Sequence, residues 1–209
     1  MQNNYEVFLK LVKENNIDRV DKMIKQGINI NEKDKYGNTA LHHACKRGYI
    51  DIVKLLLEHD ALMNYNDCDS CPLELAVLYN HYEIIELLVS YKSDPNTFDP
   101  VGLTALHLAA EKGSIKILKL LLDGGGKVNI LSNHNGNSLI HSAAIGIKGG
   151  NNECWDLMKW LFENYKESID PFYVNKCGKE PRDILDSYDW SFAEEYDDLL
   201  EQLGYYITN

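Results

Sequence analysis

Two cysteines, Cys68 and Cys71, stand three positions apart, which is the spacing of half a zinc site or of a redox pair. A structural zinc ion needs four ligands, and the sequence contains no second Cys-x-x-Cys. The nearest further candidates are His81, on the next helix turn of the same repeat, and Cys45, in the first helix of the neighbouring repeat. A metal or redox site at Cys68 and Cys71 therefore stays an alternative, beside the simpler interpretation of two small residues at the tip of a turn.

Three histidines each follow a hydroxyl residue by three positions. Thr and Ser are good residues for the N-terminal cap of a helix, and a His three residues further on can hydrogen-bond back to the cap. We therefore interpret these pairs as structural and assign them no catalytic or metal-binding role. The pairs are Thr39 with His42, Thr104 with His107, and Ser138 with His141.

Motifs of catalysis are missing from the sequence. It contains no Gly-x-Gly-x-x-Gly after a strand, no Gly-x-x-x-x-Gly-Lys-Ser/Thr and no Gly-x-Ser-x-Gly. Residues 124–127 (Gly-Gly-Gly-Lys) are superficially similar to a phosphate loop, but they directly follow an apolar helical stretch, where a helix-ending Gly is expected. We expect no enzymatic activity, no cofactor and no small-molecule substrate.

The hydroxyl and His pairs belong to a motif that recurs along the chain. Residues 37–44 (Gly-Asn-Thr-Ala-Leu-His-His-Ala) return as residues 102–109, more loosely as residues 136–143, and in degenerate form as residues 69–76. The period is about 33 residues. The same apolar position of each copy, which we expect to be buried, is occupied by Leu41, Leu73, Leu106 and Ile140.

Three of the four copies are followed, at the same distance, by an apolar stretch of helical period. Residues 51–57, 83–89 and 116–122 predict buried helices, and polar turns such as residues 46–48 separate them from a short first helix. The repeating unit is therefore turn, helix, turn, helix. In the third repeat Cys71 and Glu74 replace the hydroxyl and His pair, so we expect that repeat to be locally weaker.

This unit resembles the ankyrin repeat, whose signature is Thr-Pro-Leu-His-x-Ala and whose period is about 33 residues. The resemblance covers essentially the whole chain and implies an all-α repeat solenoid of about six helix-turn-helix repeats joined by β-hairpins or turns, with divergent repeats as caps at both ends. We expect one domain over residues 1–209. Its repeats are expected at about residues 1–33, 34–65, 66–98, 99–132, 133–174 and 175–209.

The resemblance also implies a function, because ankyrin solenoids bind partner proteins on a concave surface formed by the hairpin tips and the first helices. We expect a monomeric adaptor or inhibitor that binds a protein or peptide there. We expect one row of residues in the middle of this surface to be partly exposed together and to form an interface hot spot, namely Leu78, Tyr79, Val101 and Leu103. The positions that match the family's contact sites are Lys35, Tyr36, Asn38, Lys46, Arg47, Cys68, Leu78, Tyr79, Val101, Leu103, Glu111, Lys112, His134, Asn135 and Ile145.

Charge and hydropathy restrict the partners further. The 209 residues contain 21 Lys and Arg against 32 Asp and Glu, a net charge of −11, which argues against nonspecific binding to nucleic acid or to an anionic membrane. No apolar run is long enough to span a bilayer, and the first residues are unlike a secretory signal. We expect a cytoplasmic protein with free cysteines.

Two departures from the repeat stand out. Residues 147–152 lengthen the fifth repeat and are interpreted as an inserted turn, which could contribute to partner specificity. Residues 183–201 are rich in Asp and Glu and contain no Lys or Arg, which is typical of a solvated cap or of a docking surface for a basic partner. Together with the apolar residues 205–209, this segment is similar to the translocation signals of bacterial type IV secretion effectors. A translocated effector that binds a host protein is therefore the alternative function.

Overall fold

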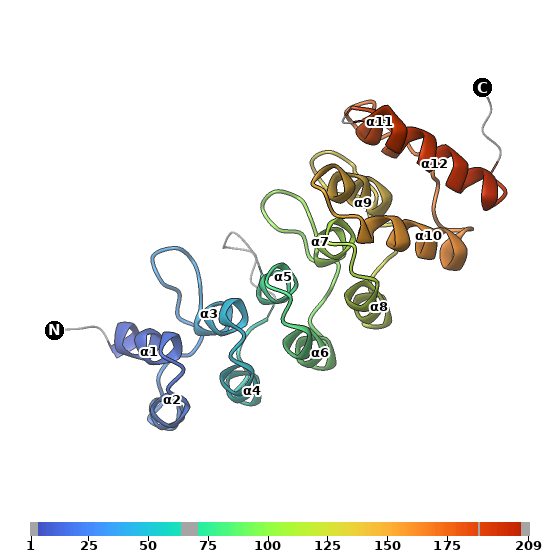
Figure 1. Ribbon diagram of the computed structural model, residues 1–209. Coiled ribbons are helices and arrows are strands. Elements are labelled where there is room, and N and C mark those ends of the chain that lie inside the picture. The colour runs from blue at the N-terminus through green and yellow to red at the C-terminus, as the bar shows by residue number, and fades with distance from the viewer. Residues whose placement is uncertain (1–3, 64–70, 188, 206–209) are drawn as a thin grey trace. The chain divides into compact units, whose positions relative to one another are not determined.

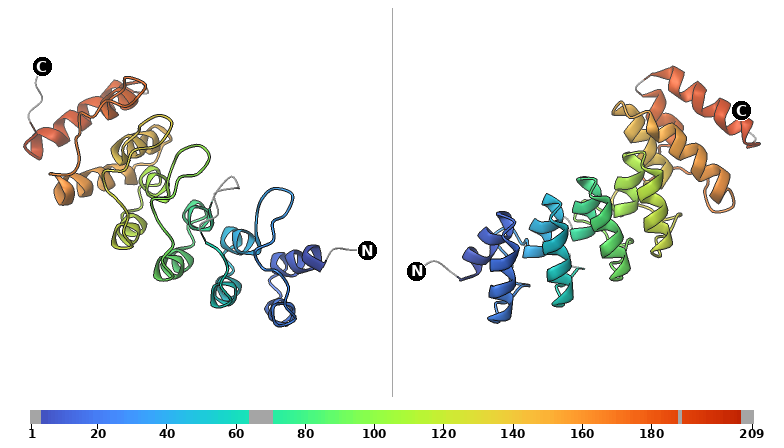
Figure 2. Two further views of the ribbon diagram at one scale, coloured as in Figure 1. Left: turned by 180° about the vertical axis from the view of Figure 1, so that it is seen from behind. Right: turned by 60° about the horizontal axis from the view of Figure 1, so that its bottom comes forward.

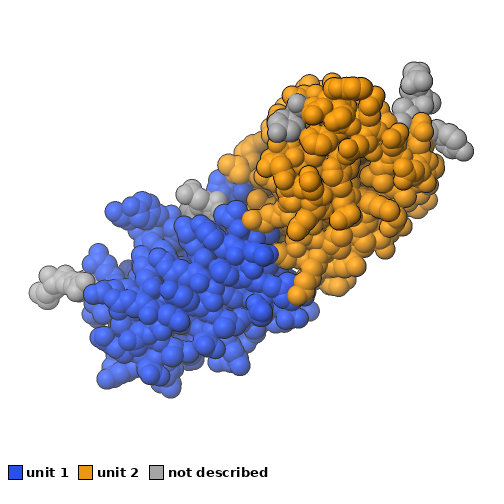
Figure 3. Space-filling view, in the orientation of Figure 1, with its two compact units in different colours: residues 1–100 blue, residues 101–209 orange. Residues whose placement is uncertain are grey.

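The computed structural model describes residues 4–63, 71–187 and 189–205. These residues form two compact units, Met1–Pro100 (unit 1) and Val101–Asn209 (unit 2), which are coloured separately in Figure 3. Cys68 and residues 206–209, on which the metal alternative and part of the effector alternative depend, lie outside the described residues. Twelve α-helices and no strand are found in the part of the chain that the structure describes.

Unit 1 consists of three helix pairs arranged as two rows (Figure 1). The first helices of the pairs, α1, α3 and α5, pack side by side, and so do the second helices, α2, α4 and α6. Figure 2 shows the same rows from two further directions. The bounds are α1 Asn4–Lys13, α2 Ile17–Lys25, α3 Ala40–Arg47, α4 Ile50–Glu58, α5 Pro72–Leu78 and α6 Tyr82–Ser90.

Unit 2 repeats this arrangement with longer C-terminal elements. Helix α9 packs between α7 and α11, α8 lies against α7, and α10 lies against α9 and α7. The last helix, α12, packs on α11. The bounds are α7 Ala105–Glu111, α8 Ile115–Asp123, α9 Leu139–Lys148, α10 Glu153–Tyr165, α11 Pro181–Asp186 and α12 Trp190–Gln202.

The apolar position predicted to be buried in every repeat forms part of the core of each unit. In unit 1, Leu41 and Leu73 are 1% and 0% exposed, and in unit 2, Leu106 and Ile140 are both fully buried. Each of these residues is the second residue of its first helix. Because an apolar side chain stabilises the fold by about 1.5–3 kcal/mol when fully buried, this one position contributes substantially to every repeat.

Glycine allows the turn that precedes four of the first helices, α3, α7, α9 and α11. The backbone at Gly37, Gly102, Gly136 and Gly178 has φ between 66° and 82°, the left-handed region that residues with a Cβ avoid. All four glycines stand at the same position of their repeats. The C-terminal cap predicted at residue 124 is confirmed, since the Gly124 N–H bonds to the Leu120 carbonyl at the end of α8.

The fifth repeat corrects one part of the interpretation of residues 147–152 as an inserted turn, namely where the turn begins. Helix α9 continues to Lys148 and α10 begins at Glu153, so only four residues separate the two helices. Ile147 is 1% exposed and therefore belongs to the core. Gly146 allows this extension because a Cβ there would collide with the backbone oxygen of Glu111 at the end of α7. Ile147 and Lys148 thus extend α9, and only residues 149–152 of the predicted segment form a turn.

One carboxylate of the acidic segment (residues 183–201) forms an ion pair between the last two helices of unit 2. Arg182 on α11 directs Nε to both carboxylate oxygens of Asp197 on α12, at 3.0 and 2.8 Å. Most other acids of α12 are exposed. One bifurcated ion pair, in which Nε reaches both carboxylate oxygens, therefore joins the segment to α11, and the remaining carboxylates of α12 face solvent.

Each of the six expected repeat ranges contains one helix pair. Whether the six repeats form a single domain stays a prediction, since the described residues divide into two compact units. Among the helices of the described residues, none combines the length and apolar character that crossing a membrane requires.

Candidate functional site

The three predicted hydroxyl and His pairs form N-terminal caps as expected. Thr104 Oγ1 lies 2.9 Å from His107 Nδ1, and the Thr104 backbone N–H donates to the same nitrogen at 3.3 Å. Thr39 with His42 and Ser138 with His141 have the same geometry, at 2.8 Å. Because Nδ1 accepts a hydrogen bond, the ring is neutral and carries its proton on Nε2.

The second ring nitrogen connects one repeat to the next, a contact that the sequence did not predict. His107 Nε2 lies 3.0 Å from the carbonyl oxygen of Asn137, and His141 Nε2 lies 2.9 Å from that of Lys179. Burial lowers the pKa of His42 and of His107 to about 4, and it also lowers the pKa of His141. These histidines are therefore uncharged at neutral pH and link neighbouring parts of the fold.

The third repeat replaces this cap by Cys71 and Glu74. The Cys71 N–H donates to Glu74 Oε2 at 2.8 Å, and the Glu74 N–H points to Cys71 Sγ at 3.5 Å, so a reciprocal capping box still forms. The other carboxyl oxygen of Glu74 is buried and has no hydrogen-bond partner among the described residues. Burial raises the pKa of Glu74 to about 7 and raises the pKa of the Cys71 thiol well above its usual range.

The buried surroundings of Cys71 argue against a metal or redox site at Cys68 and Cys71. A zinc ligand or a redox nucleophile has to be a thiolate, and burial of Cys71 disfavours that form by raising its pKa. Its expected companion Cys68 lies outside the described residues. His81 is placed elsewhere, with Nε2 3.3 Å from the Lys46 carbonyl oxygen. Among the described residues, no three His, Cys, Asp or Glu side chains are placed to hold a metal ion.

The predicted contact residues of the first hairpin lie on a well-ordered turn of unit 1. Asp34 Oδ1 accepts hydrogen bonds from the backbone N–H groups of Tyr36 and Asn38, at 2.9 and 3.0 Å. Tyr36 is 67% exposed, and Lys35 lies over its ring with Nζ 4.8 Å from the centroid. This tip therefore presents an aromatic and a cationic group on a fixed backbone.

Four other predicted residues of unit 1 meet in a groove of about 330 Å³, which we call the basic groove. Lys46 and Arg47 come from the end of α3, whereas Leu78 and Tyr79 come from the end of α5. Leu78 and Tyr79 are 43% and 44% exposed, although both are apolar or aromatic. The described lining consists of Lys13, Asn38, His42, His43, Lys46, Arg47, Leu75, Leu78 and Tyr79.

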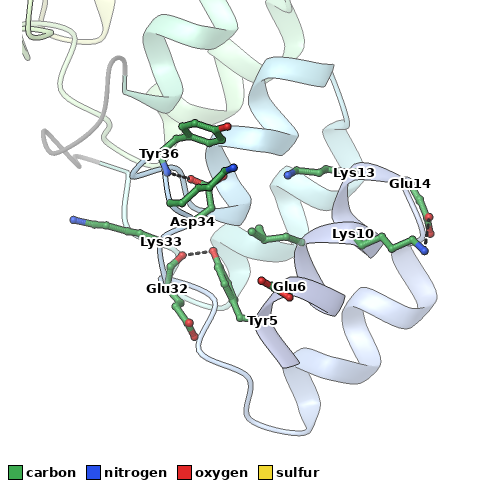
Figure 4. Close-up of a pocket in the computed structure, with 11 residues that line it drawn as sticks. Tyr5, Glu6, Lys10, Lys13, Glu14, Glu32, Lys33, Asp34 and Tyr36 are labelled. Atoms are coloured by element: carbon green, nitrogen blue, oxygen red, sulfur yellow. Dashed lines mark hydrogen bonds and ion pairs between the residues drawn. The ribbon is translucent and has the colours of Figure 1, made fainter. Parts of the chain in front are cut away.

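A second pocket of unit 1, of about 580 Å³, lies between α1 and the loop before α3 (Figure 4). The Tyr5 hydroxyl donates to the Glu32 carbonyl oxygen across this pocket, and Lys10 pairs with Glu14 at 3.8 Å. Lysines and carboxylates line it in equal number, so the pocket has no preference for either sign of charge. Its ionisable lining groups other than tyrosine are Lys10, Lys13, Lys33, Lys35, Glu6, Glu14, Glu32 and Asp34.

In unit 2 the predicted hairpin residues support one another. His134 Nδ1 lies 2.7 Å from the Val101 carbonyl oxygen, and the Lys176 N–H donates to the Asn135 carbonyl oxygen at 2.9 Å. Val101 is 62% exposed, whereas Leu103 is half-buried. The prediction that these two residues share one apolar row with Leu78 and Tyr79 spans both units and stays a prediction.

The remaining predicted residues lie where the first helices of unit 2 end. Glu111 and Lys112 are half-buried at the end of α7, and burial raises the pKa of Glu111. The Glu111 carbonyl oxygen accepts from the Cys154 thiol at 3.3 Å, so part of this residue belongs to the contact between α7 and α10. Ile145 on α9 is 36% exposed and presents an apolar side chain to solvent.

Comparison with known proteins agrees with this geometry. The family model described as ankyrin repeats (3 copies) matches residues 8–99 and 94–175. The chain is 42% identical to human BCL-6 corepressor-like protein 1 over 87 residues, which are 41% of this chain and 5% of that protein. It is 30% identical over 191 residues to an ankyrin repeat protein of Acanthamoeba polyphaga mimivirus, which covers 90% of this chain and 22% of the viral protein.

A bacterial relative is more similar in size. An ankyrin repeat protein of Rickettsia bellii is 33% identical over 122 residues, which are 56% of this chain and 67% of that protein. The chain spans less than a quarter of the length of the human and viral relatives. What those larger proteins do as a whole therefore does not transfer to this chain through the similarity alone.

Proposed function

The chain belongs to the ankyrin-repeat family, and on that premise we propose that it is a non-catalytic adaptor or inhibitor that binds a partner protein with its first helices and hairpin tips. Ankyrin repeats are protein-interaction modules. The face of the repeats that makes the contact, and the adaptor or inhibitor role, are our proposal.

The observation that carries the proposal is the exposure of Leu78 and Tyr79. The apolar residues before them on α5, such as Leu73 and Val77, are fully buried, whereas these two are 43% and 44% exposed at the end of the helix. Lys46 lies 5.6 Å from the centre of the Tyr79 ring. Exposed aromatic and aliphatic side chains bordered by cations are typical of interface hot spots, where a few residues contribute most of the binding energy.

A pair of tyrosines provides a matched test. Tyr79 is the C-terminal cap of α5, and Tyr91 is the equivalent cap of α6 in the other row, 38% exposed. We expect Tyr79→Ala combined with Leu78→Ala to abolish retention of a cellular protein in a quantitative pull-down, and Tyr91→Ala to leave retention unchanged. Circular dichroism checks that all variants remain helical. Equal retention by all variants would show that this face is not the binding surface.

The alternative is a translocated bacterial effector that binds a host protein. It is supported by the exposed acids of α12 and by similarity to the Rickettsia bellii protein. Neutralising exposed acids, as in Glu194→Gln, Glu195→Gln and Asp198→Asn, leaves the Arg182–Asp197 pair intact. In a translocation assay, loss of transport in this variant with unchanged folding supports the alternative, and unchanged transport rejects a signal in α12.

A further inference from the structure

The basic groove has an unusual charge for its surroundings. Residues 1–100 contain more Asp and Glu than Lys and Arg, yet Lys13, Lys46 and Arg47 line the groove and its described lining includes no carboxylate. All three cations are exposed, and among the described residues none of them forms an ion pair. The groove is thus a local positive site on an acidic unit.

The two histidines of the groove do not change its sign. His42 is held neutral by burial, which lowers its pKa, and by its cap to Thr39. His43 Nε2 lies 2.8 Å from Asp34 Oδ2, and Asp34 also accepts hydrogen bonds from two backbone N–H groups. The carboxylate beside the groove is therefore engaged by neighbouring donors and turned toward His43. The positive charge of Lys13, Lys46 and Arg47 remains available to a ligand.

The cations border an apolar floor. Leu75 is half-buried, and Leu78 and Tyr79 are more exposed. The Tyr79 ring has Lys46 Nζ 5.6 Å from its centroid, and it stacks on the His81 ring at 6.3 Å with an interplanar angle of 16°. His81 is itself held by the Lys46 carbonyl and packs against Gly48. The aromatic anchor is therefore oriented before any partner arrives, which lowers the entropy cost of binding.

We propose that the basic groove binds an acidic segment of the partner protein, whose carboxylates pair with Lys13, Lys46 and Arg47 while a neighbouring apolar side chain packs on Leu78 and Tyr79. This inference rests on the proposed function and specifies the chemistry of its partner. Charge complementarity selects the acidic segment, since a basic or neutral segment would leave three cations uncompensated and partly desolvated. The pocket beside α1, with its balanced charges, makes no such selection.

Selection from a random peptide library displayed on phage tests the proposal and requires no identified partner. The full chain is compared with Lys46→Glu plus Arg47→Glu, and with the matched control Lys22→Glu plus Lys54→Glu, which reverses two exposed lysines on α2 and α4. We expect the wild type and the control to enrich peptides in which Asp or Glu flank an aromatic or aliphatic residue, and the groove variant to lose this enrichment.

The most enriched peptide then provides a quantitative probe. Fluorescence anisotropy is expected to give an affinity at least about tenfold weaker for the groove variant than for the control, and an affinity that falls as salt is raised. Tyr79→Ala should weaken binding without changing the salt dependence, because it removes an aromatic contact and no formal charge. Circular dichroism of each variant shows whether a loss of binding is a loss of folding.

Three results would overturn the inference. Peptides without acidic enrichment, peptides selected equally by the groove variant, or no selected peptide at all would each reject an acidic segment as the ligand. The pull-down tests the proposed function separately. If the wild type retains a cellular protein and the Leu78→Ala plus Tyr79→Ala variant does not, the proposed function stands even when the acidic segment is rejected. Selected sequences similar to Trp190–Gln202, with concentration-dependent self-association of the wild type only, would instead identify the occupant as a second copy of the chain.

Discussion

His107 joins two consecutive repeats through the Asn137 carbonyl oxygen, 30 residues further along the chain and 3.0 Å from its Nε2. Its Nδ1 accepts from the cap residue Thr104 at the same time. One buried ring therefore fixes both the start of α7 and the hairpin that leads into α9. The placement of one repeat against the next therefore depends on a neutral imidazole, so the free energy of unfolding should depend on this ring and on pH.

Removal of this ring is expected to be strongly destabilising. His107→Ala loses the cap acceptor and removes one of the two donors of the Asn137 carbonyl oxygen, which keeps only the Ser132 N–H. We expect a loss of about 2–4 kcal/mol in the free energy of unfolding. His59→Ala is the control, because His59 is exposed and bonds only to a carbonyl of its own helix. Urea denaturation followed by circular dichroism measures both. If His107→Ala lowered the free energy of unfolding by less than His59→Ala does, the proposed role of His107 would be contradicted.

Acid should weaken the fold through the same histidines. The pKa of His107 is about 4 in the folded chain and near 6.5 when unfolded, so the unfolded chain binds more protons as the pH falls. The stability contributed by the neutral ring is present above pH 6.5 and is lost as the pH falls toward 4. Between pH 7.5 and 4.5 we expect the stability gap between wild type and His107→Gln to narrow by about 2–3 kcal/mol. A constant gap would refute this assignment.

Glu74 should give the free energy of unfolding the opposite pH dependence from that of the histidines. Burial raises its pKa from about 4.5 to about 7, so the carboxyl is more stable in the folded chain when protonated, below pH 4.5, and this contribution is lost as the pH rises through 7. Glu74→Gln removes the buried charge and is expected to raise the free energy of unfolding at pH 8 by about 1–3 kcal/mol, with little effect at pH 5. The exposed Glu83→Gln is the control. A gain that is equal at both pH values would argue against a titrating carboxyl.

Glu74→His tests the comparison between repeats. The other three complete copies have His at this position, paired with Thr or Ser. Combining Glu74→His with Cys71→Thr recreates that pair, and we expect a higher thermal midpoint at pH 7 than in the wild type. Native-state hydrogen exchange should show slower exchange in α5. If neither changes, the third repeat is not the weak element that its sequence indicates.

Gly146 is expected to tolerate no side chain. A Cβ at this position would collide with the Glu111 carbonyl oxygen and lie 2.5 Å from Cys154 Sγ, so α9 and α7 would have to separate. Gly146→Ala should lower the free energy of unfolding by about 2–4 kcal/mol. Gly149→Ala, three residues on with φ −75° and a nearest neighbour at 3.2 Å, should change it by less than about 1 kcal/mol. Equal effects would mean that the close approach is not needed.

Much of the fold follows from the sequence because its repeating positions obey local rules. Leu41 and Leu106 are buried as predicted, and Thr104 and His107 cap their helix as predicted. These features depend on contacts within one repeat, over three or four residues, where spacing determines geometry. Because the same short motif recurs several times along the chain, the fold can be predicted from it although one copy alone would be weak evidence.

The remaining features depend on contacts between repeats, which spacing alone does not determine. Glycines usually end a helix, which favours a turn near residue 147, yet Gly146 lies inside α9 where the neighbouring helix approaches. The bond from His107 Nε2 to Asn137 and the pairing of Arg182 with Asp197 join residues in different elements. The basic groove likewise arises from α1, α3 and α5 together.

Site-specific photo-crosslinking in cell lysate tests the central claim most directly. A photoreactive phenylalanine derivative replaces Tyr79 in one variant and Tyr91 in the other, so that the two matched helix caps report on opposite rows of helices. The account predicts that the probe at position 79 forms a covalent adduct with a partner protein, and that the probe at position 91 does not. Adducts formed only at position 91, or at neither position, would contradict binding through the first helices and hairpin tips.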